Sequence, residues 1–229
     1  MSPASRFDAV LFDLDGTLLD TAPDMIAALN LLRGQEGLDA LPYATARSQV
    51  SHGSSGLVAL AFPAVAGEAF ERLRERFLAL YYDRLAVDTQ LFEGCEAVLL
   101  ALEAQGKPWG IVTNKPAFLT TPLVETLALA NRAGCVVSGD TLPQRKPHPA
   151  PLLHAASLIG IDPPRCLYVG DAQRDIQSAR AAGMTVLVAR YGYLGPTDDP
   201  DSWAADGEIA TPLDLLDWLA LPGPLPAHA

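Results

Sequence analysis

Four short apolar runs, each bounded by polar or turn residues, stand out along the chain: Ala9–Phe12, Trp109–Val112, Cys166–Val169 and Thr185–Ala189. Runs of this length are typical of strands that are buried on both faces of a parallel sheet. Helix-like stretches lie between them, including Glu96–Gln105, Pro149–Ile159 and Asp175–Ala182. This alternation predicts an α/β fold with a doubly wound, Rossmann-like parallel sheet.

The interval from about residue 20 to about residue 89 breaks the alternation. It holds helical patterns at Met25–Arg33 and Phe70–Arg84 and no convincing strand. We therefore predict a core domain formed by residues 1–19 and 90–229, with a small helical cap domain inserted at residues 20–89. The insertion leaves after the first strand, so it is placed to cover the carboxyl ends of the strands. Near the other end of the chain, the Pro-rich segment Leu221–Pro226 is predicted to fray.

Charge and composition narrow the classes of partner. Lys and Arg number 16 against 27 Asp and Glu, and the formal net charge of −11 argues against nucleic acid and anionic membranes as partners. No apolar run reaches about 18 residues, and Asp8 and Asp13 interrupt the first one, so neither a membrane span nor a signal peptide is predicted. The 3 cysteines are widely spaced and indicate neither disulfides nor zinc, so a reducing cytoplasm is expected.

Polar side chains follow the apolar runs at the strand ends, where doubly wound sheets bind their ligands. The first run is followed by Asp13 and Asp15, the second by Thr113 and Asn114, and the third by Gly170 and Asp171. Two carboxylates so close together repel, and such a pair is kept mainly where a cation neutralises it or one member is protonated. For this motif alone, a turn or helix-capping role is the alternative.

A second acidic pair, Asp171 and Asp175, is predicted to lie on one face at the start of a helix. Taken alone, these residues fit helix caps as well as ligands. However, the strand that ends before Asp171 is predicted to lie beside the first strand. This would bring Asp171 to the same edge of the sheet as Asp13. Three carboxylates, with no His or Cys in these loops, favour Mg²⁺ over zinc or copper. Lys146 lies in the loop before the predicted helix Pro149–Ile159, which precedes the third apolar run. By itself it is typical of an ordinary surface lysine.

Together these residues resemble the four motifs of the haloacid dehalogenase-like hydrolase superfamily. In chain order the matching segments are Asp13–Thr17, Thr113, Lys146 and Gly170–Asp175. The resemblance covers nearly the whole chain, including a cap inserted after the first motif. Residues 113–116 and 146–149 look most like the phosphoglycolate phosphatase branch, and residues 190–206 look still more like bacterial N-acetylmuramic acid 6-phosphate phosphatases.

The resemblance implies a Mg²⁺-dependent phosphomonoesterase that acts on a small phosphorylated metabolite through an aspartyl-phosphate. The substrate would be 2-phosphoglycolate or N-acetylmuramic acid 6-phosphate. Asp13 would be the nucleophile and Asp15 the acid and base, while Thr113, Asn114 and Lys146 would bind the phosphoryl group.

For the metal, the resemblance implies Asp13, the backbone carbonyl of Asp15 and Asp171 as ligands. Asp175 would orient Lys146 or a metal-bound water. In the cap, residues 51–56 are predicted to form a flexible polar loop, in which His52 and Gly53 contact the leaving group; an interhelical turn is the alternative.

Two other functions share part of this residue pattern. A phosphorylatable signalling receiver also gathers Asp, Thr and Lys at the edge of a doubly wound sheet, but it is shorter and carries its acceptor Asp later in the chain. A phosphomutase of the same fold would pass the phosphoryl group to a sugar instead of water. The motifs leave the phosphomutase open.

Overall fold

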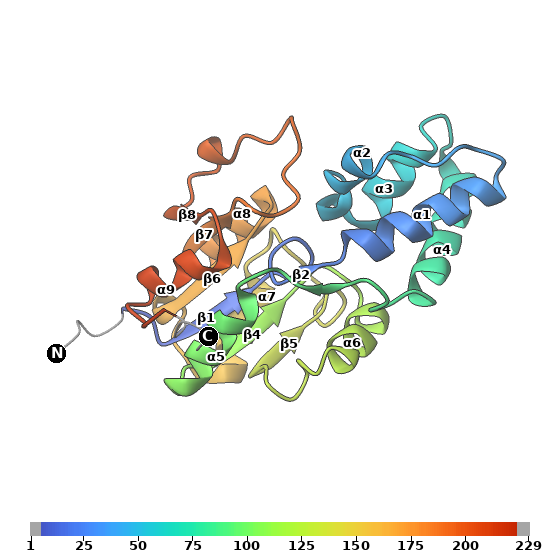
Figure 1. The fold of residues 1–229 in the computed structure, drawn as a ribbon. Coiled ribbons are helices and arrows are strands. Elements are labelled where there is room, and N and C mark those ends of the chain that lie inside the picture. Colours follow the sequence, from blue (N-terminus) through green and yellow to red (C-terminus); the bar gives the residue numbers. More distant parts are fainter. Residues whose placement is uncertain (1–5, 224–229) are drawn as a thin grey trace.

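The predicted parallel sheet is present in the structure, a computed structural model in which residues 6–223 are described. This part of the chain contains a six-stranded sheet in the order β5-β4-β1-β6-β7-β8, with every neighbouring pair parallel (Figure 1). Its strands are β1 Ala9–Phe12, β4 Trp109–Val112, β5 Cys135–Val137, β6 Cys166–Gly170, β7 Thr185–Ala189 and β8 Gly207–Ile209. In this order β1 lies between β4 and β6.

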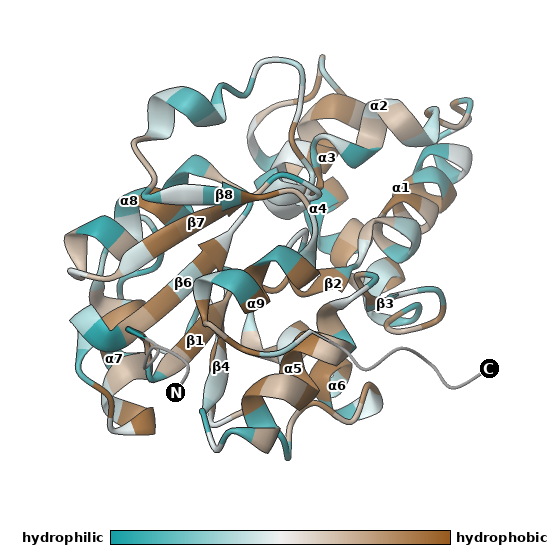
Figure 2. Cartoon of the chain, turned by 60° about the vertical axis from the view of Figure 1, so that its left-hand side comes forward, coloured by the Kyte–Doolittle hydropathy of each residue, from teal (hydrophilic) through white to brown (hydrophobic). Residues whose placement is uncertain are grey.

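Helices cover both faces of the sheet. The core helices are α5 Cys95–Ala104, α6 Ala117–Thr126, α7 Ala150–Ile159, α8 Gln173–Ala181 and α9 Leu215–Trp218, with short 3₁₀ turns at Pro163–Arg165, Pro200–Trp203 and Pro212–Asp214. Val10 and Phe12 of β1 pack in one apolar cluster with α5, α6 and α9, whereas Ala9 and Leu11 pack in another with α7 and α8. Neighbouring strand residues point to opposite faces, and every residue of β1, β4, β6 and β7 is buried. The apolar character of β1, β6 and β7 can be followed in Figure 2. The doubly wound fold is confirmed.

The predicted helix boundaries shift by up to three residues. At the fourth motif the shift bears on the site, because α8 begins at Gln173, so Asp171 precedes the helix and only Asp175 lies in its first turn. The Pro-rich segment predicted to fray, Leu221–Pro226, lies outside the described residues from position 224 onward. Within residues 6–223, no helix combines the length and the apolar character needed to cross a membrane.

The interval between β1 and α5 is helical, as predicted. It contains α1 Ala22–Gln35, α2 Tyr43–Arg47, a 3₁₀ turn η1 Val50–His52, α3 Gly53–Ala61 and α4 Gly67–Tyr82. These helices share an apolar cluster of their own, with Leu29, Val58 and Phe77 among its buried members. We refer to residues 20–89 as the cap; its exact bounds, and those of the core at 1–19 and 90–229, stay a prediction.

One prediction for the cap is wrong. Residues 51–56 do not form a loop, since η1 runs directly into α3 at Gly53 and the segment is helical on both sides of that residue. A short strand pair that was not predicted lies at the edges of the interval, because β2 Leu19–Asp20 pairs with β3 Gln90–Leu91 where the chain enters and leaves the cap. A two-residue strand has too few positions to show an apolar alternation, and its pairing joins residues far apart in the sequence.

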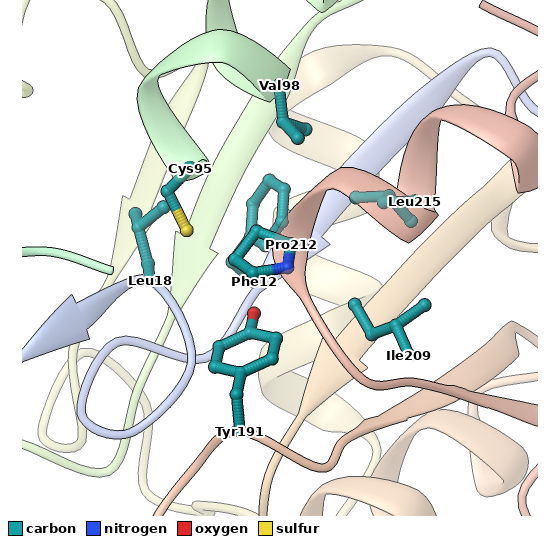
Figure 3. A pocket seen from close by; sticks show the side chains of 8 residues that line it. All are labelled: Phe12, Leu18, Cys95, Val98, Tyr191, Ile209, Pro212 and Leu215. Carbon is teal, nitrogen blue, oxygen red and sulfur yellow. The ribbon is translucent and has the colours of Figure 1, made fainter. Parts of the chain in front are cut away.

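A packed apolar layer lies beneath the turn that follows β1. Phe12, Leu18, Cys95 and Tyr191 are among the side chains that converge there, and the space between them holds no room for a water molecule (Figure 3). The Tyr191 hydroxyl donates a hydrogen bond to the carbonyl oxygen of Thr17 at 3.0 Å. This layer is therefore part of the core, and it supports the turn that carries the first motif.

Candidate active site

Three strand ends meet at one edge of the sheet and carry the predicted site. The strands β4, β1 and β6 are neighbours and parallel, and they are followed directly by Thr113, Asp13 and Asp171. All three of these side chains are buried. The pairing of β1 with β6 confirms the expectation that Asp171 lies beside the first motif.

Asp13 and Lys146 form the buried centre of this edge. Lys146 Nζ lies 2.8 Å from Asp13 Oδ1 and 2.7 Å from Asp175 Oδ1, and its side chain is 0% exposed. The same ammonium donates to the carbonyl oxygen of Val112 at 2.7 Å. The backbone N–H of Leu14 also donates to Asp13 Oδ1, at 2.7 Å. One oxygen of Asp13 is thus held by two donors.

Asn114 holds Lys146 in place through the backbone. Its Oδ1 accepts the N–H of Lys146 at 3.0 Å, and its Nδ2 donates to the Lys146 carbonyl at 2.9 Å. Both ends of the Asn114 amide are therefore engaged with the loop that carries Lys146. The neighbouring Thr113 Oγ1 accepts the N–H of Lys115 at 3.1 Å, which leaves its own hydroxyl proton to donate.

Asp13, Asp171 and Asp175 form an acidic cluster, each with a carboxylate oxygen within 4.8 Å of the others. Burial raises the pKa of Asp171 to about 7, and the charges of Asp13 and Asp175 add to the rise. Burial and Asp175 also raise the pKa of Asp13 to about 6, against the opposing charge of Lys146. Burial alone would raise the pKa of Asp175, but Lys146 and Arg174 outweigh it, and this pKa lies below its usual value.

The cluster fits a hard divalent cation. Carboxylates whose pKa values are raised by burial and by mutual repulsion, as those of Asp13 and Asp171 are, are the groups that such a cation stabilises. Asp171 Oδ2 accepts hydrogen bonds from Ser51 Oγ at 2.6 Å and from the Tyr193 N–H at 2.9 Å. Its Oδ1 is buried and has no hydrogen-bond partner among the described residues. An oxygen in that state is suited to bind a metal ion.

Glycine at position 16 lets the first motif pass close to this cluster. The φ angle of Gly16 is +85°, in the left-handed region that favours glycine, and a Cβ built there would lie 2.1 Å from Asp171 Oδ2. A larger residue would displace Asp171. Position 16 therefore requires glycine both for the backbone turn and for the close packing against Asp171.

Asp15 faces a different lysine from Asp13. Its Oδ1 lies 2.7 Å from Lys115 Nζ and accepts a hydrogen bond from Thr21 Oγ1 at 2.6 Å. Lys115 also donates to the hydroxyl of Tyr81, a residue of the cap, at 2.8 Å. Burial would lower the pKa of Lys115, but the charge of Asp15 outweighs it and the pKa is raised. Among the described residues, the acidic cluster does not include Asp15.

A polar cleft of about 230 Å³ opens beside the cluster, between the cap and the core. Ser51 and His52 line it from the cap, and Asp171, Arg174 and Asp198 are among its lining residues from the core. His52 lines this cleft from a 3₁₀ turn, and its contact with a leaving group stays a prediction. Gly53 does not line the cleft; it is the junction at which α3 begins.

The sequence comparison identifies the family. The family model described as haloacid dehalogenase-like hydrolase matches residues 10–189 of the chain. The chain belongs to the haloacid dehalogenase-like hydrolases. The resemblance inferred from the four motifs is thereby confirmed.

Similar haloacid dehalogenase-like proteins carry phosphatase names. A phosphoglycolate phosphatase from Xanthomonas campestris pv. campestris is 47% identical over 216 residues, covering 94% of this chain and 98% of that protein. An N-acetylmuramic acid 6-phosphate phosphatase from Pseudomonas aeruginosa is 43% identical over 215 residues, covering 93% and 95%. A crystal structure described as a predicted phosphoglycolate phosphatase from Haemophilus somnus 129pt matches with a TM-score of 0.83 at 27% identity, covering 94% and 99%.

Two cations of this haloacid dehalogenase-like site were missed by sequence reasoning. Lys115 follows Thr113 and Asn114 at the end of β4, and Arg174 stands between Asp171 and Asp175. Their positions within strand-end motifs were the available signal. In the structure Lys115 is buried, and Arg174 Nη2 lies 3.9 Å from Asp13 Oδ2.

Proposed function

We propose that the chain is a Mg²⁺-dependent phosphatase that hydrolyses a small phosphate ester through a phosphorylated Asp13. The observation that carries the proposal is the buried Asp13 carboxylate, held by Lys146 at 2.8 Å beside two further carboxylates. Membership of a hydrolase family whose similar members carry phosphatase names supports it.

Asp13, Asp171 and Asp175 are the side chains that would hold the metal, together with the Asp15 backbone carbonyl that the family resemblance implies. Carboxylate and carbonyl oxygens are the ligands that Mg²⁺ prefers. When bound, the ion would offset the charge of the acidic cluster and of the phosphoryl oxygens. The proposal thus gives Asp175 two roles, as a candidate ligand and as the partner of Lys146.

The chemistry divides into two displacements at phosphorus. In the first, a carboxylate oxygen of Asp13 forms a bond to phosphorus while the bond to the leaving oxygen breaks, and Asp15 gives that oxygen a proton. In the second, Asp15 takes a proton from water as the water oxygen bonds to phosphorus and the bond to Asp13 breaks. Inorganic phosphate leaves and Asp13 is restored.

The neighbouring side chains orient these groups. Lys146 fixes one oxygen of Asp13 and offsets its charge, and Asn114 holds the loop that carries Lys146. The Thr113 hydroxyl has a proton available for a phosphoryl oxygen. Lys115 and Thr21 hold Asp15, and Tyr81 ties Lys115 to the cap.

For the substrate we propose 2-phosphoglycolate or N-acetylmuramic acid 6-phosphate, the two classes that the names of similar proteins supply. Both carry a carboxylate in addition to the phosphate. Ser51 and His52 lie on the cap side of the cleft, where a leaving group would extend. A cytoplasmic location stays a prediction.

A phosphatase screen tests the proposal. The wild-type protein is incubated with each of the two candidate esters and with other sugar phosphates, with Mg²⁺ or with EDTA, and free phosphate is measured. We expect Mg²⁺-dependent release of phosphate and a preference in kcat/KM for one ester. An isomerised sugar phosphate without phosphate release would instead identify a phosphomutase.

Replacement of the nucleophile gives the matching test. Asp13→Asn keeps the shape of the side chain but removes its charge, and we expect kcat to fall by at least about a thousandfold. Asp83→Asn makes the same change at an exposed cap position and should leave kcat unchanged. Full activity of a folded Asp13→Asn protein would exclude the mechanism.

A further inference from the structure

The hydrogen-bonding capacity of Lys146 is fully used within the protein. A lysine ammonium has three N–H donors. Its three charged or carbonyl acceptors lie at 2.7 Å for Val112, 2.8 Å for Asp13 and 2.7 Å for Asp175, and the Tyr168 hydroxyl lies at 2.8 Å. With these acceptors and no exposed surface, the side chain lies below the cleft and is not among the residues that line it.

Arg174 is in the opposite state. It comes from the first turn of α8, lines the cleft together with Asp171 and His52, and a quarter of its side chain is exposed there. Its Nε is buried and has no hydrogen-bond partner within residues 6–223. The guanidinium group carries five N–H donors in a planar fork that matches two oxygens of a phosphate.

The position of Arg174 relative to Asp13 is also suitable. Asp13 Oδ1 is held by Lys146 and by the N–H of Leu14, whereas Arg174 Nη2 lies 3.9 Å from Oδ2. A phosphoryl group that meets Asp13 from the cleft therefore comes within reach of the guanidinium. Lys115 does not compete for this place, because its ammonium faces Asp15 and Tyr81 and its side chain is 4% exposed.

We propose that Arg174 is a further side-chain cation that binds the phosphoryl group, by donating N–H bonds to its non-bridging oxygens. This inference rests on the proposed function, since it assigns a ligand within the same site. Formal charge agrees with it. The cluster of Asp13, Asp171 and Asp175 against Lys146 and Arg174 has one net negative charge, which a divalent cation makes one positive. Without Arg174 the loaded site would be neutral towards a dianion.

Calorimetric titration with inorganic phosphate, in the presence of Mg²⁺, tests this role. We expect Arg174→Met to weaken phosphate binding about ten- to a hundredfold, the range for charge-assisted hydrogen bonds. The phosphate affinity of Arg174→Lys should lie between those of Arg174→Met and the wild type, because lysine keeps the charge but lacks the planar fork of donors. Arg180→Met makes the same charge change at an exposed position of α8 and should bind phosphate within about twofold of the wild type.

Titration with Mg²⁺ alone separates phosphate binding from a structural role. Removal of a cation beside three carboxylates should leave Mg²⁺ affinity of Arg174→Met unchanged or higher. Loss of Mg²⁺ binding together with phosphate binding would mean that Arg174 only supports the acidic cluster, and the inference would fail. It would fail equally if Arg174→Met bound phosphate like the wild type. In both cases hydrolysis by the wild-type protein would still support the proposed function.

Discussion

At the scale of single residues, the site holds more buried carboxylates than cations to pair with them. Lys146 is shared by Asp13 and Asp175, and Asp171 receives only hydrogen bonds from Ser51 and Tyr193. Burial, and then repulsion from the neighbouring carboxylates, raises the pKa values of Asp13 and Asp171. Ionised carboxylates in this arrangement lower the stability of the metal-free protein.

The pKa of Asp171 predicts a pH-dependent loss of stability without metal. An unfolded Asp titrates near pH 3.9, whereas folded Asp171 titrates at about 7. Between these values the folded protein keeps a proton that the unfolded chain has lost. The contribution to stability is therefore complete below about pH 4 and is lost as the pH rises through 7. In EDTA, we expect Asp171→Asn to be more stable than the wild type at pH 8, by roughly 2–4 kcal/mol.

Urea unfolding at pH 5.5 and pH 8 measures this effect. Between the two pH values the wild type should lose more stability than Asp171→Asn, while Asp83→Asn should follow the wild type. Added Mg²⁺ at pH 8 should stabilise the wild type and leave Asp171→Asn nearly unchanged. Equal losses for the wild type and Asp171→Asn would show that Asp171 is not the titrating group.

The sequence indicated the acidic residues of the site better than its cations. Asp13 and Asp171 follow buried strands directly, so their placement at one edge came from the strand order alone. The partners of Lys115 could not be predicted, because the contact with Tyr81 depends on how the cap packs on the core. Asn114 was predicted to bind the phosphoryl group, but both ends of its amide form hydrogen bonds with the backbone of Lys146. Nothing in the sequence indicated these two bonds.

At the scale of elements, the junction between the cap and the core depends on Asp24, a buried carboxylate in the first turn of α1. It accepts the N–H of Asp88 at 3.1 Å and both the N–H and the hydroxyl of Thr89, at 2.9 and 2.7 Å. These bonds join the chain entering the cap to the chain leaving it.

Truncation of Asp24 should therefore destabilise the whole protein. We expect Asp24→Ala to lower the free energy of unfolding by about 2–3 kcal/mol, because buried donors lose a charged acceptor. Asp24→Asn keeps one acceptor oxygen and should cost less. Urea unfolding gives the comparison, with Asp83→Ala as the exposed control. A change below about 0.5 kcal/mol in Asp24→Ala would show that water replaces the carboxylate.

The strands that the sequence predicted are those with uninterrupted apolar runs of four or five residues. The bounds of β1, β4 and β7 match the prediction to the residue, since each is a buried run flanked by polar positions. The strands β5 and β8 were not predicted, because each has three residues, and β8 begins with Gly207 and Glu208. Residues 51–56 read as a loop from their Gly and Ser content, but packing of the cap helices makes them helical.

At the scale of the whole molecule, the net charge of −11 opposes the approach of an anionic substrate. The Debye length is about 10 Å at 0.1 M salt, so added salt screens distant carboxylates more than the charges inside the site. We expect kcat/KM for p-nitrophenyl phosphate to rise about twofold between 20 and 200 mM KCl at saturating Mg²⁺, with kcat nearly constant. A steady fall in kcat/KM would mean that the local positive charge governs the approach.

The pairing of β2 with β3 places the entry and exit of the cap side by side. Leu19 is opposite Leu91, and Asp20 is opposite Gln90. Paired residues of an antiparallel ladder lie only about 5 Å apart, a gap that a two-residue turn closes. The insertion can therefore be exchanged as a unit: removing residues 21–89 leaves two chain ends already in hairpin register, and a foreign cap can be grafted there without redirecting any strand of the sheet.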